Sequence, residues 1–334
     1  MRKYWLLPLL LLASCGKTEP IPQSKSEGAE SASSSSLPPL PSDDHERIAL
    51  YQKGNVPYDG GDGEEYAFLT PYLASDPTGG AVIVLPGGGY THLSNSTPEE
   101  GSRYGGSNND GDPKEAAAIV PYYNQAGISV FVLNYRTTVI DQSLDYHGLL
   151  ADVLRAVRLV SSLSEEYRFD HLAVQGFSAG GHLALMAHEQ KGFAIDDPSY
   201  EKDDIDELPI EIDSLILGYP VVSFLDGLTH ASTRKTFTGS DPSLYETFSA
   251  ELHVDEDFPS TYLFHEEKDP TVSIQGSERL DAELTFFDID HRYDRFADEA
   301  SDDAPLHGFG VNEGLAEAKA WMQTATSFLK ERSF

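Results

Sequence analysis

The sequence has 334 residues, and its 40% hydrophobic and 10% aromatic content is ordinary for a globular protein and too high for a disordered chain. The formal net charge of −32 at pH 7 argues against binding to nucleic-acid phosphates or anionic lipid headgroups, and it disfavours uronate- or sulfate-rich substrates. The single cysteine excludes an intramolecular disulfide and a cysteine-cluster metal site.

The beginning of the chain has the pattern of a bacterial lipoprotein signal. Arg2 and Lys3 precede an apolar run at 4–12, which is too short to span a bilayer as a stable anchor. The sequence Leu-Ala-Ser-Cys that ends at Cys15 then resembles a lipobox. We therefore expect residues 1–14 to be a signal peptide and Cys15 to carry the lipid. An ordinary secretory signal with an unrelated cysteine is the alternative.

Residues 15–43 are rich in Ser, Pro, Glu and Gly and show no periodic apolar pattern. This composition is typical of a flexible tether, here one that holds a globular domain off a membrane. Gly16 stands where an aspartate would signal retention at an inner membrane. We therefore expect the protein at the outer membrane or the cell surface, with the lipid anchor as its membrane contact.

In the remaining chain, 44–334, short apolar runs alternate with helical patterns. This alternation predicts one α/β domain with a mostly parallel sheet and helices on both faces. In chain order, the predicted strands are an edge strand at 65–73 and further strands at 81–85, 129–134, 171–175, 214–217, 261–264 and 283–287. The predicted helices span 113–126, 149–163 and 315–329.

The strongest catalytic signal is Gly-Phe-Ser-Ala-Gly at 176–180, directly between a predicted strand and a helical pattern. G-x-S-x-G in a strand–turn–helix setting is typical of a nucleophile elbow, from which the serine hydroxyl projects at the end of the sheet. The start of the following helix also favours developing negative charge. We therefore predict Ser178 to be a nucleophile.

A glycine-rich loop, Pro-Gly-Gly-Gly-Tyr at 86–90, follows the strand predicted at 81–85. Glycines let backbone N–H groups approach a ligand closely, and acyl transfer needs such donors where the oxyanion forms. We predict that the N–H groups of Gly88, Gly89 and Ala179 form an oxyanion hole. A plain turn is the alternative, and a dinucleotide site is disfavoured because the full G-x-G-x-x-G pattern is missing.

Eleven histidines compete for the role of general base. His307 is the best candidate, because its loop joins the last predicted strand to the closing helix and can reach the same end of the sheet as Ser178. His182 lies inside the helix that follows the nucleophile and is interpreted as a packed structural residue. His265 and His291 are weaker candidates for the base.

The carboxylate that orients the base is predicted to be Asp269, in the loop after the strand at 261–264. Loops at the carboxyl ends of parallel strands carry the chemistry of such sheets. Glu266 and Glu267 lie nearer the strand, and we interpret them as solvated loop charges. The chain order of serine, aspartate and histidine is the order expected of an α/β-hydrolase.

Several stretches together resemble a known family across nearly all of 48–334: the bacterial acetylxylan-esterase-like and feruloyl-esterase-like α/β-hydrolases. The stretches are IALY at 48–51, PGGGY at 86–90, LNYR at 133–136, GFSAGGHLA at 176–184, GYPV at 218–221, HEEKDPTV at 265–272 and HGFG at 307–310. The resemblance implies the α/β-hydrolase fold, a triad of Ser178, Asp269 and His307, and the oxyanion hole named above. It also implies esters of plant or algal carbohydrates, most often acetyl esters, as substrates.

Two segments, 95–112 and 288–304, are longer than this family usually has, and we expect both around the mouth of the site. Much of the acidic charge lies at 194–213, at 288–304 and in the tether, and solubility is the favoured explanation of it. Rejection of acidic sugars by acidic loops at the site mouth is the alternative. The Asp-, Asn- and Gly-rich part at 105–112 does not follow the EF-hand pattern. A calcium loop there is therefore the weaker interpretation. Ester hydrolysis by a serine, a histidine and an aspartate needs no metal and no cofactor, and we predict none. Arg136 and Asp152 match positions that look structural in the family.

The predicted function is that of a serine carboxylesterase acting on short-chain, chiefly acetyl, esters of carbohydrate such as acetylated xylan oligosaccharides. A serine peptidase or a lipase of the same fold is the alternative enzyme. A surface-anchored binding module with a hydrolase fold is the non-enzymatic alternative, although the complete set of catalytic residues favours an enzyme. The sequence does not indicate the oligomeric state, the sugar or the acyl group.

Overall fold

The structure is a computed structural model, and it describes residues 47–59, 67–94, 115–301 and 305–334. Several predictions lie outside these residues: those for the signal peptide at 1–14, for Cys15, for the tether at 15–43 and for the loop at 95–112. Within the described part of the chain, no helix is both long and apolar enough to cross a membrane.

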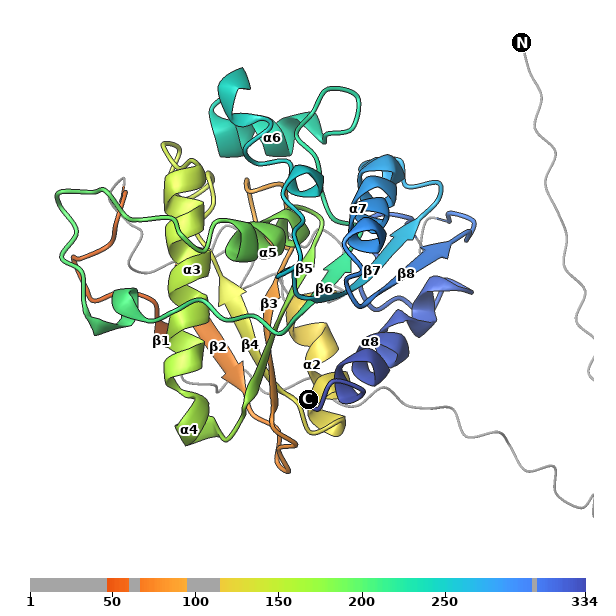
Figure 1. Cartoon of the computed structure of the whole chain (residues 1–334), viewed down its shortest axis with the longest axis horizontal. Helices are drawn as coiled ribbons and strands as arrows, with labels where there is room; N and C mark the ends of the chain where they lie inside the picture. The colour runs from red at the N-terminus through yellow and green to blue at the C-terminus, as the bar shows by residue number, and fades with distance from the viewer. Residues whose placement is uncertain (1–46, 60–66, 95–114, 302–304) are drawn as a thin grey trace, which may run out of the picture. The chain divides into compact units, whose positions relative to one another are not determined.

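The described strands form one eight-stranded sheet in the order β1-β2-β4-β3-β5-β6-β7-β8 (Figure 1). Their bounds are β1 Ile48–Ala49, β2 Phe68–Tyr72, β3 Gly80–Leu85, β4 Ser129–Asn134, β5 His171–Phe177, β6 Ser214–Gly218, β7 Ser260–Glu266 and β8 His291–Phe296. β2 pairs antiparallel with β1 and β4, and all other neighbours are parallel. The predicted mostly parallel sheet is thus confirmed, and the predicted strand at 129–134 has the observed bounds.

Helices cover both faces of this sheet, because successive side chains of each buried strand point to opposite sides. In β3, Ala81, Ile83 and Leu85 enter one core with α3, α5 and α7, whereas Val82 and Val84 enter a second core with α2 and α8. The helices are α2 Val120–Gln125, α3 Tyr146–Ser162, α4 Ser164–Tyr167, α5 Ala179–Glu189, α6 Ala231–Thr238, α7 Ile274–Phe286 and α8 Trp321–Lys330.

The last strand is not where the sequence predicts it. Residues 283–287 lie at the end of α7, whose side-chain cap is Ser273 and whose buried Leu280 and Leu284 are four residues apart, as on one face of a helix. The strand is β8 instead. It lies at the sheet edge, is mostly polar with only Phe296 buried, and therefore lacks the apolar run that marks a buried strand.

Three further boundaries differ from the prediction. β2 is not the edge strand, because the two-residue β1 pairs outside it. Ahead of α2, the described chain is a 3₁₀ turn, η2 (Ala116–Ile119), which begins at a residue with a positive φ of 52°. The closing helix α8 is likewise preceded by a 3₁₀ turn, η6 (Ala318–Ala320), and not by regular helix from residue 315.

Candidate active site

The segments that follow β3, β5 and β7 meet at the carboxyl ends of these strands, because parallel strands end on the same side of the sheet. The glycine loop follows β3, Ser178 follows β5, and Asp269 follows β7. A later loop, between β8 and η6, brings His307 to the same place. Residues nearly 220 positions apart in the sequence thus surround one point.

Ser178 occupies a tight turn between β5 and α5. Its φ is 53° and its ψ is −118°, a conformation that side-chain-bearing residues rarely adopt. The chain approaches itself closely here: a Cβ on Gly176 would lie 2.1 Å from the Gly180 carbonyl oxygen, and one on Gly180 would lie 2.3 Å from the Leu85 carbonyl oxygen. The two flanking glycines are therefore required by packing, as a nucleophile elbow demands.

The structure brings the three predicted catalytic side chains into one hydrogen-bonded chain. His307 Nε2 lies 3.0 Å from Ser178 Oγ, and His307 Nδ1 lies 2.7 Å from Asp269 Oδ2. Both distances are within hydrogen-bond reach. Ser178 is 8% exposed and the His307 side chain 16% exposed, so both remain accessible to a small substrate.

Asp269 is fully buried and receives four hydrogen bonds. The backbone N–H groups of Thr271 and Val272 donate to Oδ1 at 2.7 and 2.9 Å, and His265 Nε2 lies 3.1 Å from Oδ2, beside His307. Burial by itself raises the pKa of Asp269, but the hydrogen bonds from His265 and His307 outweigh burial and hold that pKa well below its usual range. Asp269 is thus ionised throughout the physiological range.

The predicted oxyanion residues lie around Ser178. Gly88 and Gly89 have φ of 122° and 64°, and both line the same cavity as Ser178. A Cβ on Gly88 would lie 2.0 Å from the His92 carbonyl oxygen, so the loop requires glycine there. Ala179 is the first residue of α5, and its N–H is therefore one of the helix-end donors without an intrahelical acceptor.

A cavity of about 280 Å³ opens in front of the serine and histidine. Its described lining is made of glycines, hydroxyl side chains, imidazoles and one carboxylate: Gly87, Gly88, Gly89, Thr91, His92, Ser94, Glu115, Ser178, His230, Ser232, Thr271, His307 and Gly308. Lysine, arginine and large aliphatic side chains are absent from this described lining. The space suits a small ligand that is polar and uncharged.

The other histidines considered for the base have different roles. His182 is fully buried, with Nε2 3.0 Å from the Phe248 carbonyl oxygen and Nδ1 2.7 Å from Tyr90 Oη. Burial lowers the pKa of His182 to about 4, so it is a neutral core residue, as predicted. His291 lies on β8 against Asp281. His265 contacts Asp269 and not Ser178.

The interpretation of Glu266 as a solvated charge is wrong. Glu266 ends β7 with no exposed surface, and its burial beside Asp298 raises its pKa to about 7. Asp298 accepts hydrogen bonds from backbone N–H groups of residues 316–318. Only Glu267 is exposed, and it pairs with Arg295 at 3.1 Å.

The described part of the 288–304 segment lies outside the lining of the cavity. It contains β8, and none of residues 288–301 is among those that line the cavity. Two of its carboxylates are paired with nearby cations: Asp294 with Arg292 at 2.9 Å, and Glu299 with Lys268. Rejection of acidic sugars by loops at the mouth stays a prediction, because residues 95–112 and 302–304 lie outside the described residues.

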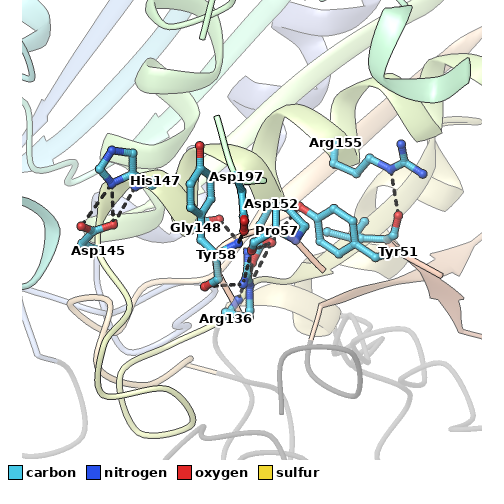
Figure 2. A network of polar contacts seen from close by, with 11 residues as sticks. Tyr51, Pro57, Tyr58, Arg136, Asp145, His147, Gly148, Asp152, Arg155 and Asp197 are labelled. Carbon is cyan, nitrogen blue, oxygen red and sulfur yellow. Dashed lines mark hydrogen bonds and ion pairs between the residues drawn. The ribbon is translucent and has the colours of Figure 1, made fainter. Parts of the chain in front are cut away.

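Arg136 and Asp152 form a buried ion pair (Figure 2). Neither is among the residues that line the cavity. Arg136 Nη2 lies 2.8 Å from Asp152 Oδ1, and Nε lies 3.0 Å from Oδ2. Nη1 and Nη2 also donate to the carbonyl oxygens of Pro57 and Gly148. Tyr51 Oη donates to the same carboxylate at 3.0 Å. The pair ties the segment around Tyr51 and Pro57 to the chain just after β4 and to α3, in agreement with a structural role.

Sequence reasoning missed several residues of the site, among them Glu115, His230 and Tyr219, which have titratable side chains. Glu115 and His230 line the cavity, and Tyr219, after β6, packs edge-to-face on His307 with ring centroids 5.0 Å apart. Glu115 carries no local signal, because its partners are 28 and 104 positions away. Tyr219 does follow a predicted strand, and that position could have been recognised.

No group of three or more His, Cys, Asp or Glu side chains within the described residues is placed to hold a metal ion. The sheet order, the strained serine after β5 and the serine–aspartate–histidine order together define an α/β-hydrolase, which confirms the predicted fold. The chain belongs to the BD-FAE family, whose model matches residues 101–284.

Individual proteins agree with this membership. An acetylxylan esterase from Xylanibacter ruminicola is 27% identical over 191 residues, which are 55% of this chain and 32% of that protein, so the match covers about a third of the relative. An acetyl ester-xyloside bifunctional hydrolase from Caldicellulosiruptor lactoaceticus superposes with a TM-score of 0.70 at 27% identity, over 87% of this chain and 97% of that one. The carboxylesterase Cest-2923 from Lactobacillus plantarum, at 21% identity and a TM-score of 0.58 over 80% and 93% of the two chains, shares the fold.

Proposed function

We propose that the protein is a serine carboxylesterase that removes short acyl groups, chiefly acetyl, from neutral carbohydrates such as acetylated xylan oligosaccharides. The observation that carries this proposal is the chain of contacts from Asp269 through His307 to Ser178, at 2.7 and 3.0 Å, in the wall of a small polar cavity. The names of the xylan- and xyloside-directed relatives support the choice of carbohydrate.

The geometry supports a two-step reaction. His307 Nε2 takes the Ser178 proton as Oγ attacks the ester carbonyl carbon, and the N–H groups of Gly88, Gly89 and Ala179 stabilise the resulting oxyanion. His307 returns that proton to the leaving alcohol. Water, deprotonated by His307, then attacks the acyl carbon; the bond to Ser178 Oγ breaks, His307 gives the proton to Oγ, and the acid leaves. Asp269 keeps Nδ1–H of His307 in the tautomer that both steps require.

The cavity lining favours this substrate class over the alternatives. A lipase needs an apolar surface for a long acyl chain, whereas the described lining has only glycine, hydroxyl, imidazole and carboxyl groups. Hydroxyl and imidazole groups are suitable partners for sugar hydroxyls. The absence of Lys and Arg from the described lining also leaves no cation to recognise an acidic sugar or a peptide carboxylate.

Replacement of Ser178 by alanine tests the chemistry. We expect hydrolysis of 4-nitrophenyl acetate to fall by about 10⁴-fold or more while thermal unfolding stays close to that of the wild type. A fluorophosphonate probe should label the wild type at Ser178 and leave Ser178→Ala unlabelled. Retained hydrolysis in the variant would refute the proposal, and absence of labelling in the wild type would favour a binding module.

The substrate is tested separately, by product release from acetylated xylan, acetylated glucomannan and feruloyl esters. We expect acetate release from the acetylated polysaccharides, and 4-nitrophenyl palmitate should be a poor substrate beside 4-nitrophenyl acetate. A preference for palmitate would identify a lipase. Cleavage of a peptide substrate with no ester activity would identify a peptidase.

We also propose that the protein is exported and anchored to the cell envelope, at the outer membrane or the cell surface, by a lipid on Cys15. The support is the basic, apolar and small-residue pattern that ends at the single cysteine. Cys15→Ala should move the protein from the membrane fraction to the soluble fraction. Persistence of the variant in the membrane fraction would show that the anchor is assigned wrongly.

A further inference from the structure

The site contains one buried carboxylate that the proposed reaction does not use, Glu115, which is 3% exposed and lines the cavity. Its Oε2 accepts a hydrogen bond from the Gly87 N–H at 2.8 Å, and its Oε1 accepts one from Tyr219 Oη–H at 2.8 Å. Tyr219 Oη in turn accepts a hydrogen bond from the Gly310 N–H at 2.9 Å. A continuous chain of hydrogen bonds thus joins Gly87 to Gly310.

The two backbone N–H groups at the ends of this hydrogen-bond series fix which group donates in each of its bonds. Gly87 and Gly310 contribute backbone N–H groups, which can only donate, so the Tyr219 proton must point to Glu115. Both carboxylate oxygens therefore accept, which is the arrangement of the ionised form. Burial raises the pKa of Glu115 above its usual value, and the hydrogen bonds from Gly87 and Tyr219, together with charge on His307, offset that rise only in part.

The two ends belong to the loops that build opposite parts of the site. Gly87 directly precedes the predicted oxyanion donors, and Gly310 lies three residues after His307. We propose that Glu115 is a positioning residue that holds the oxyanion loop and the histidine loop in register and supplies a fixed negative charge favouring protonated His307. The catalytic part of this inference rests on the proposed esterase function.

Several titratable groups face His307 from the surrounding segments. They are Asp269 after β7 with His265 behind it, Tyr219 after β6, His230 before α6, His92 in the glycine loop and Glu115 before η2. Asp269 and Glu115 are the carboxylates of this described set. Asp269 is bonded to His307 Nδ1 directly, so Glu115 is the second negative charge that acts on the imidazolium formed during the reaction.

Glu115→Gln tests the inference, because glutamine keeps the side-chain shape and one acceptor oxygen but removes the charge. We expect kcat to fall about 10- to 100-fold with KM little changed. The acid limb of the kcat/KM profile should also move about 0.5 to 1 unit toward lower pH. A role limited to holding the fold would leave that limb in place.

Tyr262→Phe is a matched control, since Tyr262 Oη donates to Asp294 at 3.0 Å in a phenol–carboxylate contact that does not line the cavity. It should keep the wild-type kcat and pH profile. Should Glu115→Gln fail to fold, Tyr219→Phe severs the link to Gly310 but leaves the Gly87 bond. It should lower kcat at unchanged KM, and a wild-type kcat would overturn the positioning role.

NMR of histidine-labelled protein follows His307 protonation without any substrate. The midpoint should move to lower pH in Glu115→Gln and stay in place in Tyr262→Phe. A folded Glu115→Gln protein with unchanged midpoint and unchanged kcat would overturn the inference. A shifted midpoint in a protein that hydrolyses no ester would instead overturn the proposed function and support the charge effect, so the two failures are distinguishable.

Discussion

Two buried carboxylates, Asp152 and Glu115, meet opposite electrostatic conditions. Asp152 faces the guanidinium of Arg136 at 2.8 Å, and the pair is closed to solvent. Glu115 receives its hydrogen bonds from a backbone N–H and a tyrosine, both uncharged. The charge of Asp152 is therefore compensated by Arg136, and the pair stabilises the fold. The charge of Glu115 is stabilised only by dipoles, so it can still attract the positive charge that His307 gains during the reaction.

Asp269 belongs with Glu115 in this comparison. Its hydrogen bonds come from two backbone N–H groups and from two imidazoles, which are not permanently charged. A guanidinium in their place would neutralise the carboxylate and weaken its effect on His307. The scaffold around Arg136 and the site around His307 should therefore respond differently when a carboxylate is removed.

Asp269→Asn should have the largest effect. An amide in place of the carboxylate allows His307 the wrong tautomer, and kcat should fall by about 10⁴-fold. Stability should change less than activity, because asparagine retains an oxygen for the Thr271 and Val272 N–H groups. Hydrolysis of 4-nitrophenyl acetate and thermal unfolding measure the two quantities.

Asp281→Asn is the matched control for that variant. His291 Nε2 lies 3.1 Å from Asp281 Oδ1, so the pair repeats the histidine–aspartate contact away from Ser178. Activity should be that of the wild type. Equal losses in the two variants would show that the Asp269 effect is not specific to the catalytic histidine.

Asp152→Ala should have the opposite effect to Asp269→Asn: stability should fall and activity should be kept. It leaves the Arg136 guanidinium buried without its carboxylate, and the free energy of unfolding should fall by about 3–5 kcal/mol. The kcat of the folded fraction, counted by fluorophosphonate labelling, should stay near the wild-type value. Asp226→Ala removes a partner of Arg234 that is 89% exposed, and it should have little effect on stability. A specific loss of kcat in Asp152→Ala would contradict the division into scaffold and site.

Asp152 is stabilised by a cation and Glu115 by dipoles, whereas the buried Glu266 is stabilised by binding a proton. Its pKa is raised to about 7, so the folded protein binds a proton that the unfolded chain releases near pH 4.5. Stability from this group is complete below that lower value and is lost as pH rises to about 7, on the order of 2–3 kcal/mol. Denaturant unfolding between pH 4.5 and 8 should show this slope, and Glu266→Gln should flatten it.

Asp298 should change the free energy of unfolding with pH in the opposite direction to Glu266. Burial tends to raise the Asp298 pKa, but backbone N–H groups of residues 316–318 outweigh burial and lower it. Its contribution is therefore present above the unfolded pKa and disappears as pH falls below it. The pH range in which Asp298 acts therefore lies below the pH range in which Glu266 acts. A slope between pH 4.5 and 7 that persists in Glu266→Gln would assign that dependence to another group.

The parts of the molecule that the sequence predicts well are those with local patterns. Buried strands β3 and β4 are apolar runs, and Ser178 lies in a strand–turn–helix pattern of small residues. β8 escapes prediction because an edge strand needs no apolar face. Glu266 and Glu115 escape it because burial of a charge depends on partners that only the fold supplies, such as Asp298 and Tyr219.

The smallest predicted effect concerns backbone strain, which also differs between site and scaffold. Ser178 and Arg168 both have positive φ, 53° and 58°, but Arg168 is an exposed residue at the end of α4. Arg168→Gly should raise the free energy of unfolding by about 0.5–1 kcal/mol, because glycine adopts this conformation without the Cβ conflict. Arg168→Ala keeps that conflict and should bring no gain. Both variants should keep the wild-type kcat, since the strain at Arg168, unlike that at Ser178, aims no group at the substrate. Equal stability of the glycine and alanine variants would show that the conformation at residue 168 costs nothing.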